Sequence, residues 1–192
     1  MIRLLTTTAI VAVGLLAAAP AGFAQSTQPN AAGRAASTAP GKDALSQEDK
    51  TFIKEAAIGG MAEVEFSKIA QKSDNADIKS FANRMVQDHS AANSQLTGIV
   101  SGLGVEAPKA LDSQHERMRE KLQTLHGKSL DDQYMRDMVD DHNKAVKLFQ
   151  QEQRSGHNAD LKQFAQQTSP TLQEHQRMAI ELSHKLARTA AR

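Results

Sequence analysis

Apolar residues recur at alternating spacings of three and four along most of this chain, which is the period of one face of an α-helix. Four long segments follow the pattern and predict helices over about 47–72, 76–100, 130–154 and 159–186. The first predicted helix opens with Ser46-Gln47-Glu48-Asp49, which resembles a capping box. Pro170 lies inside the last predicted helix and should kink it or create a bulge.

The segments between the predicted helices carry turn signals. Turn-forming residues at 73–75 (Ser-Asp-Asn) and 156–158 (Gly-His-Asn) separate the helices within each pair. The connection between residues 100 and 130 is longer and predicts a short helix over about 114–125, with Ser113 as its N-cap and Gly127 ending it.

An internal repeat relates the two helix pairs. Residues 75–82 read NADIKSFA, and residues 158–165 read NADLKQFA. Two similar hairpins joined by one long connection are typical of a ferritin-like bundle, in which that connection crosses from one end to the other. We therefore expect one all-α domain over residues 44–188, a ferritin-like four-helix bundle whose long connection between the second and third helices contains a short helix.

The residues before this domain predict export. Residues 1–24 resemble a signal peptide, with Arg3 before an apolar run and small residues at Gly22 and Ala24, so we expect cleavage before Gln25. The apolar run is shorter than the roughly 20 residues of a spanning helix, which predicts no stable membrane insertion after cleavage and a periplasmic location. Residues 25–43 are small and polar and predict a disordered linker.

Composition limits the functions to consider. The chain has 23 basic and 22 acidic residues, and aromatic residues make up only 4%. A balanced charge with few aromatics gives no basis for nucleic-acid binding. Because Cys is absent, a metal site would have to use His, carboxylate or Met ligands. Nothing in the sequence indicates an oligomeric state.

Each apolar stripe contains one polar residue that does not suit a buried seam: Glu63, His89, His142 and His175. At 1.5 Å per residue, Glu63 and His89 lie roughly 18 and 21 Å from the first turn, and His142 and His175 roughly 24 and 26 Å from the second. If the turns lie at opposite ends of a bundle roughly 40 Å long, all four residues share one layer near mid-height.

One carboxylate and three imidazoles form a plausible ligand set for a divalent transition metal such as Zn, Fe, Mn or Cu. The alternative is a structural polar core in which Glu63 accepts hydrogen bonds from the histidines. Met85 and Met138 lie one turn before a core His, which would suit Cu(I), although Met is also an ordinary core residue. Asp88, Asp141 and Glu174 directly precede the three histidines; we interpret them as solvated flank charges rather than as acceptors for a neighbouring imidazole.

The motifs around this layer resemble an exported, ferritin-like bacterial family of domains of unknown function, often labelled outer-membrane proteins. They are GMAEVE at 60–65, FA at 81–82 with MVQDH at 85–89, MVDDH at 138–142 and PTLQEH at 170–175. The resemblance covers about residues 44–185 and implies the four-helix fold and export, without an established activity. Ferritins proper carry Glu-x-x-His on two helices. Val86, Val139 and Leu172 stand at those Glu positions here, so a carboxylate-bridged di-iron oxidase is not expected.

Three functional hypotheses follow from these features. The first is a metal-binding or metal-buffering protein of the cell envelope, connected with stress. The second is a non-catalytic structural or interaction bundle with a hydrogen-bonded His–Glu layer. The third is a redox or hydrolytic enzyme with an open metal position; since no other catalytic motif is present, the sequence favours a non-enzymatic role.

Overall fold

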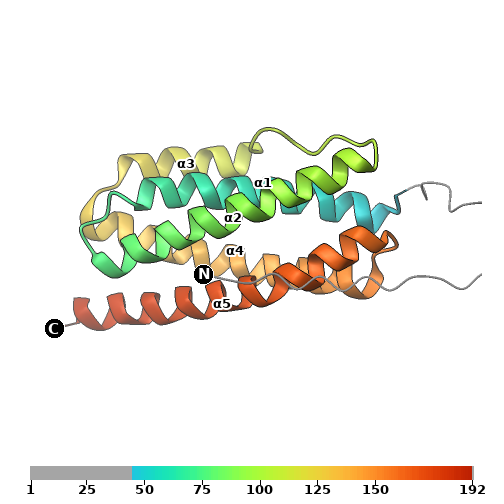
Figure 1. Cartoon of the computed structure of the whole chain (residues 1–192). Helices are drawn as coiled ribbons and strands as arrows, with labels where there is room; N and C mark the ends of the chain where they lie inside the picture. The colour runs from blue at the N-terminus through green and yellow to red at the C-terminus, as the bar shows by residue number, and fades with distance from the viewer. Residues whose placement is uncertain (1–44, 192) are drawn as a thin grey trace, which may run out of the picture. The chain divides into compact units, whose positions relative to one another are not determined.

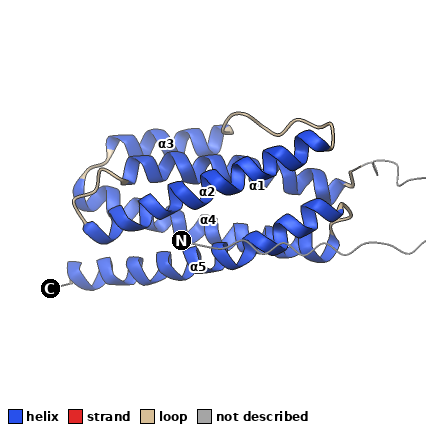
Figure 2. Ribbon diagram, in the orientation of Figure 1, coloured by secondary structure: helices blue, strands red, loops and turns tan. Residues whose placement is uncertain are grey.

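The computed structural model describes residues 45–191, and these form five α-helices packed as a bundle (Figures 1 and 2). The helices are α1 (Gln47–Ala70), α2 (Ala76–Gly102), α3 (Ser113–Thr124), α4 (Gly127–Ser155) and α5 (Ala159–Ala190). The all-α prediction is confirmed. The predicted signal peptide at 1–24 and linker at 25–43 lie outside the described residues.

Side-chain caps determine where three of the helices begin. Ser46 Oγ accepts from the backbone N–H of Asp49 at 3.0 Å, and Asp49 accepts from the backbone N–H of Ser46 at 2.9 Å, so the predicted capping box is confirmed. Asn75 caps α2, and Asn158 caps α5 in the same way, each accepting from the N–H groups two and three residues on. The internal repeat therefore encodes two equivalent helix starts.

Some predicted boundaries were wrong around α3 and at the helix ends. Asp112, not Ser113, caps α3 by accepting from the backbone N–H of His115 at 2.9 Å. Gly127 begins α4 instead of only ending α3, because its φ of 51° turns the chain directly into the next helix. The α5 helix extends through Pro170 to Ala190, a turn beyond the predicted end. These ends carry polar or small residues, for which apolar periodicity gives no signal.

Contacts between distant segments place the two hairpin turns at opposite ends of the bundle. Asp49, at the start of α1, accepts from the backbone N–H groups of His157 and Asn158 at 3.0 and 3.1 Å. Ser73, in the turn after α1, donates to Asp131 near the start of α4 at 2.6 Å. In the bundle, α1 packs against α2 and α4, α5 packs against α4 and α2, and α3 lies against α1 and α4 (Figure 1).

The buried apolar residues form two clusters, one toward each end of the bundle. One includes Phe66, Ile78 and Tyr134, and the other includes Phe52 and Phe149, whose rings meet edge-on with centroids 4.9 Å apart. On α2, α4 and α5 the two clusters are separated by His89, His142 and His175, and on α1 Glu63 lies at the boundary, next to Ala62 of the first cluster. The core is therefore interrupted by a polar layer near its middle.

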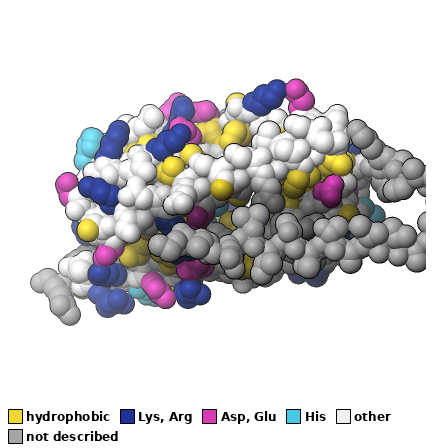
Figure 3. Space-filling model, viewed as in Figure 1, with side chains coloured by type: hydrophobic (Ala, Val, Ile, Leu, Met, Phe, Trp, Pro, Cys, Tyr) yellow, Lys and Arg dark blue, Asp and Glu magenta, His cyan; other side chains and the backbone are white. Residues whose placement is uncertain are grey.

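The outer surface carries both signs of charge. Figure 3 shows Lys and Arg interspersed with Asp and Glu on the visible face of the described part. None of the described helices is long and apolar enough to cross a membrane.

Candidate metal centre

The structure brings the four predicted polar residues together from four different helices. His142 and His175 are fully buried, and Glu63 and His89 are each only 4% exposed. The three imidazole centroids lie 5.2–5.5 Å apart, and Glu63 approaches His89 at 2.9 Å and His142 at 3.2 Å. The predicted convergence in one layer is confirmed.

Each imidazole has one ring nitrogen beside an oxygen that can only accept a hydrogen bond. Nδ1 of His89 lies 2.9 Å from Oε2 of Glu63, Nδ1 of His142 lies 2.9 Å from the carbonyl of Met138, and Nε2 of His175 lies 2.8 Å from Oδ2 of Asp88. These three nitrogens must therefore carry hydrogen and donate it. A neutral ring then leaves a lone pair on its other nitrogen.

The remaining nitrogens are the ones available to a ligand. Nδ1 of His175 lies 3.3 Å from Nε2 of His89, and one ring nitrogen from each of the three histidines lies within 4.8 Å of the other two. Two imidazoles bound tetrahedrally to one ion at 2.0–2.1 Å have nitrogens roughly 3.3 Å apart. Nε2 of His142 is buried without a hydrogen-bond partner among the described residues. This cluster of three histidines could hold a metal ion.

Electrostatics within the layer favour a carboxylate beside mostly neutral rings. Burial would raise the pKa of Glu63, but His89 and His142 outweigh it and bring that pKa to about 2. Burial lowers the pKa of His175 to about 4, with nearby His89 acting in the same direction, and burial also lowers the pKa of His142. Burial opposes charge on His89 as well, yet Glu63 raises its pKa. Neutral imidazole is the form that ligates metals.

Glu63 occupies a different position from the three histidines. It faces Nδ1 of His89, the nitrogen that donates to it, and the converging group contains histidines alone among the described residues. Its Oε1 lies near Nδ1 of His142 but accepts no hydrogen bond from the described part of the chain, since that N–H donates to Met138. Direct ligation by Glu63 stays a prediction.

Asp88 contacts an imidazole, which the sequence did not predict. It was interpreted as a solvated charge, whereas it accepts from His175 on α5 rather than orienting its neighbour His89. Arg84 donates a hydrogen bond to Asp88 at 3.3 Å and two hydrogen bonds to Glu174 at 3.0 and 2.8 Å. Within the described part of the chain, Glu174 forms no hydrogen bond or ion pair with an imidazole, and it is half-buried at its helix flank. An Asp–His pair on one helix signals a possible acceptor, but it does not tell which imidazole the acid meets.

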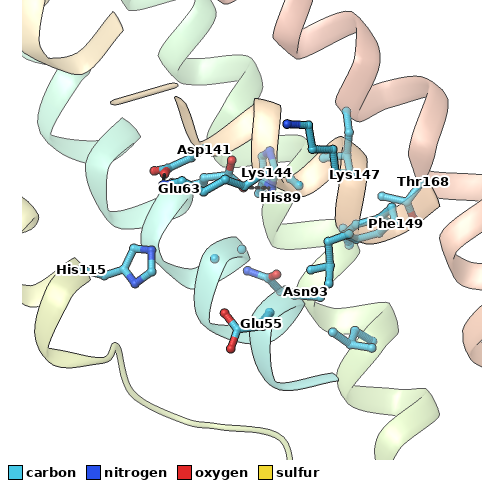
Figure 4. Close-up of a pocket in the computed structure, with 18 of the residues that line it drawn as sticks. Glu55, Glu63, His89, Asn93, His115, Asp141, Lys144, Lys147, Phe149 and Thr168 are labelled. Atoms are coloured by element: carbon cyan, nitrogen blue, oxygen red, sulfur yellow. Dashed lines mark hydrogen bonds and ion pairs between the residues drawn. The ribbon is translucent and has the colours of Figure 1, made fainter. Parts of the chain in front are cut away.

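A cavity of about 540 Å³ adjoins the histidine layer. Glu63 and His89 line its buried side, together with Asp141, whose Oδ2 is buried and has no hydrogen-bond partner within the described residues. Burial and the neighbouring Glu63 both raise the pKa of Asp141. Figure 4 shows Glu63, His89 and Asp141 close together at one side of this cavity, with His115 and Glu55 at others.

Comparisons with known proteins agree with the fold. Residues 34–182 match the family described as "Domain of unknown function (DUF4142)". A crystal structure of a "putative secreted protein DUF305" from Streptomyces coelicolor is 18% identical, covering 73% of this chain and 92% of its own with a TM-score of 0.63. A DUF305 fragment from Deinococcus radiodurans is 16% identical, covering 75% and 98%, also with a TM-score of 0.63. No curated protein matches this chain. At these identities the two structures support the fold alone.

Proposed function

We propose that this chain, which belongs to the DUF4142 family of domains of unknown function, is an exported periplasmic protein that binds a divalent transition metal. In this proposal His89, His142 and His175 are the protein ligands. Glu63 and Asp88 hold His89 and His175 in the required tautomers by accepting their other N–H groups. Metal buffering in the cell envelope, connected with stress, is the role that such a site would serve.

The environment of the Nε2 atom of His142 is the observation that carries this proposal. This atom is buried, it has no hydrogen-bond partner in residues 45–191, and its ring is fixed by the bond from Nδ1 to the Met138 carbonyl at 2.9 Å. A buried polar atom without a partner costs about 1–3 kcal/mol. A metal ion shared with the other two histidines would remove that cost.

The alternative is a structural polar core, and one contact favours it. Nδ1 of His175 and Nε2 of His89 lie 3.3 Å apart, so a protonated His89 could bridge Glu63 and His175 by hydrogen bonds alone. That arrangement satisfies His89 and His175 but gives Nε2 of His142 no partner. We therefore favour the metal site.

The ligand atoms limit which metals the site would prefer. Three neutral imidazoles suit Zn, Cu and Fe better than the hard ions that prefer oxygen, and Mn becomes a candidate only if Glu63 also ligates. Three protein ligands leave at least one further position for water, as in catalytic zinc sites. An enzymatic role would need a substrate at that position, and we do not propose one.

The remaining parts of the proposal concern architecture and location. We infer a ferritin-like arrangement, in which the connection containing α3 crosses the bundle between α2 and α4; the opposite placement of the two hairpin turns supports it. Export rests on the signal-like residues 1–24. A mature protein beginning at Gln25, measured by intact mass after purification from the periplasm, would test it.

Metal binding is tested on the untagged protein. Elemental analysis of the purified protein and thermal melts with added Zn²⁺ would show a bound ion and a raised Tm, since a ligand of the native state stabilises it. His89→Ala and His142→Ala should each abolish the metal-induced shift and leave a folded apoprotein. His184→Ala, which removes an exposed histidine of α5, is the matched control. If the wild type shows no shift and the two core substitutions only destabilise, the structural alternative holds.

A further inference from the structure

The proposed ligands are almost inaccessible, which raises the question of how an ion reaches them. His142 and His175 have no exposed surface, and His89 is 4% exposed. Exchange of a metal therefore needs either local opening of the bundle or a route between the helices. The cavity of about 540 Å³ touches His89 directly. We propose, resting on the proposed function, that this cavity is the access route for a hydrated divalent cation, with the Glu63 and Asp141 carboxylates binding the cation before the histidines do.

The size of the cavity suits a hydrated ion. Water occupies about 30 Å³ per molecule in the liquid, so an ion with six waters takes roughly 200 Å³. The cavity can hold such an ion without loss of its water shell. Dehydration can then occur next to the protein ligands, not at the surface.

The charges along the cavity form a path from the surface inward. Glu55 and Asp112 lie at the outer side, with side chains 46% and 43% exposed. Asp141 is only 11% exposed and Glu63 only 5%. Two lysines, Lys144 and Lys147, also line the cavity, so the four carboxylates outnumber the cations. Negative charge of this kind concentrates cations and speeds their association.

The inner pair of carboxylates has unused acceptor atoms. Oε1 of Glu63 and Oδ2 of Asp141 are both buried and accept no hydrogen bond from any residue that the structure describes. Lys144 reaches Asp141 only through Oδ1, at 3.1 Å. Glu63 is 4% exposed as a residue and still lines the cavity, so a cation in the cavity would lie beside its carboxylate. A cation bound by Glu63 would lie next to His89, whose Nδ1 is 2.9 Å from Oε2 of Glu63.

Two glycines offer a matched test of the route. A Cβ at Gly59 would meet nothing within 4 Å, and Gly59 lines the cavity, so Gly59→Leu would place its side chain there without a backbone clash. A Cβ at Gly98 is equally free, but Gly98 is exposed on α2 and does not line the cavity. Gly98→Leu therefore controls for the change of a helical Gly to Leu.

The experiment follows Co²⁺ binding to the whole apoprotein by stopped-flow absorbance. We expect Gly59→Leu to slow association at least tenfold while reaching the wild-type visible spectrum at saturation, and Gly98→Leu to bind at the wild-type rate. Asp141→Asn should slow association at least threefold, whereas Asp140→Asn should not. Unchanged association in Gly59→Leu would overturn the route, and unchanged association in Asp141→Asn would overturn the role of the carboxylate pair. A wild type that takes up no Co²⁺ would instead overturn the proposed function, and the route with it.

Discussion

Replacing Asp88 with Asn separates a metal centre from a structural core by removing one charge outside the ligand set. Asp88 accepts the Nε2–H of His175 at 2.8 Å, which leaves Nδ1 of that ring free to ligate. Asn at this position keeps the size and one acceptor oxygen but loses the charge. The side chain is 28% exposed, so water can compensate part of the loss in the apoprotein.

The expected effect can be worked out in free energy. Loss of the acceptor behind a ligating histidine typically weakens metal affinity by 10–100-fold. At a free metal concentration of 100 times the wild-type Kd, binding stabilises the wild type by about 2.7 kcal/mol. The variant would gain only about 1.4 kcal/mol after a tenfold loss and about 0.4 kcal/mol after a hundredfold loss. For a chain of this size, 1 kcal/mol shifts Tm by about 2–4 °C.

The assay is a pair of thermal melts by circular dichroism, with and without Zn²⁺, at one metal concentration. Glu174→Gln is the matched control, because Glu174 also precedes a core histidine and binds Arg84 at 2.8 Å, but among the described residues it forms no hydrogen bond or ion pair with an imidazole. Asp88→Asn should lose about half or more of the metal-induced rise in Tm, and Glu174→Gln should keep it. An equal loss in both variants, or full retention in Asp88→Asn, would refute the assignment of Asp88 as the acceptor for a ligand.

Three further predictions concern protons and packing. Since Glu63 raises the pKa of His89 against the opposing effect of burial, metal binding should release a proton and become tighter as pH rises. Calorimetry in two buffers of different ionisation enthalpy should therefore give different heats of metal binding, and equal heats would contradict this prediction. Burial and Asp49 raise the pKa of Glu152 to about 7. Because this folded pKa lies above the unfolded value of 4.5, the stability that Glu152 contributes is fully present below pH 4.5 and is lost as pH rises through 7. Glu152→Gln should therefore raise Tm at pH 8 and leave it nearly unchanged at pH 4. Gly59→Ala should stabilise the fold by about 1 kcal/mol through helix propensity, whereas Gly60→Ala should gain less in denaturant unfolding, because its Cβ would lie 2.1 Å from Oδ1 of Asn93.

The sequence alone determined most of the architecture, because the forces that set it are local. Apolar periodicity located the four long helices, and Ser46, Asn75 and Asn158 marked three of their starts through side-chain caps. The constant rise of a helix then converts distance from a turn into height. This is why Glu63 and the three histidines could be assigned to one layer before any contact was known.

Only the tertiary structure decided the chemistry of that layer. Sequence spacing sets the height of a side chain, but the orientation of an imidazole depends on the oxygen that its N–H meets. For His175 this oxygen belongs to Asp88, 87 residues away. The two adjacent glycines also differ in the space beside them, since a Cβ at Gly60 would lie 2.1 Å from Oδ1 of Asn93, whereas a Cβ at Gly59 would meet nothing within 4 Å among the described residues. Such differences arise from rotation about packed helices, which a one-dimensional pattern does not resolve to the level of individual atoms.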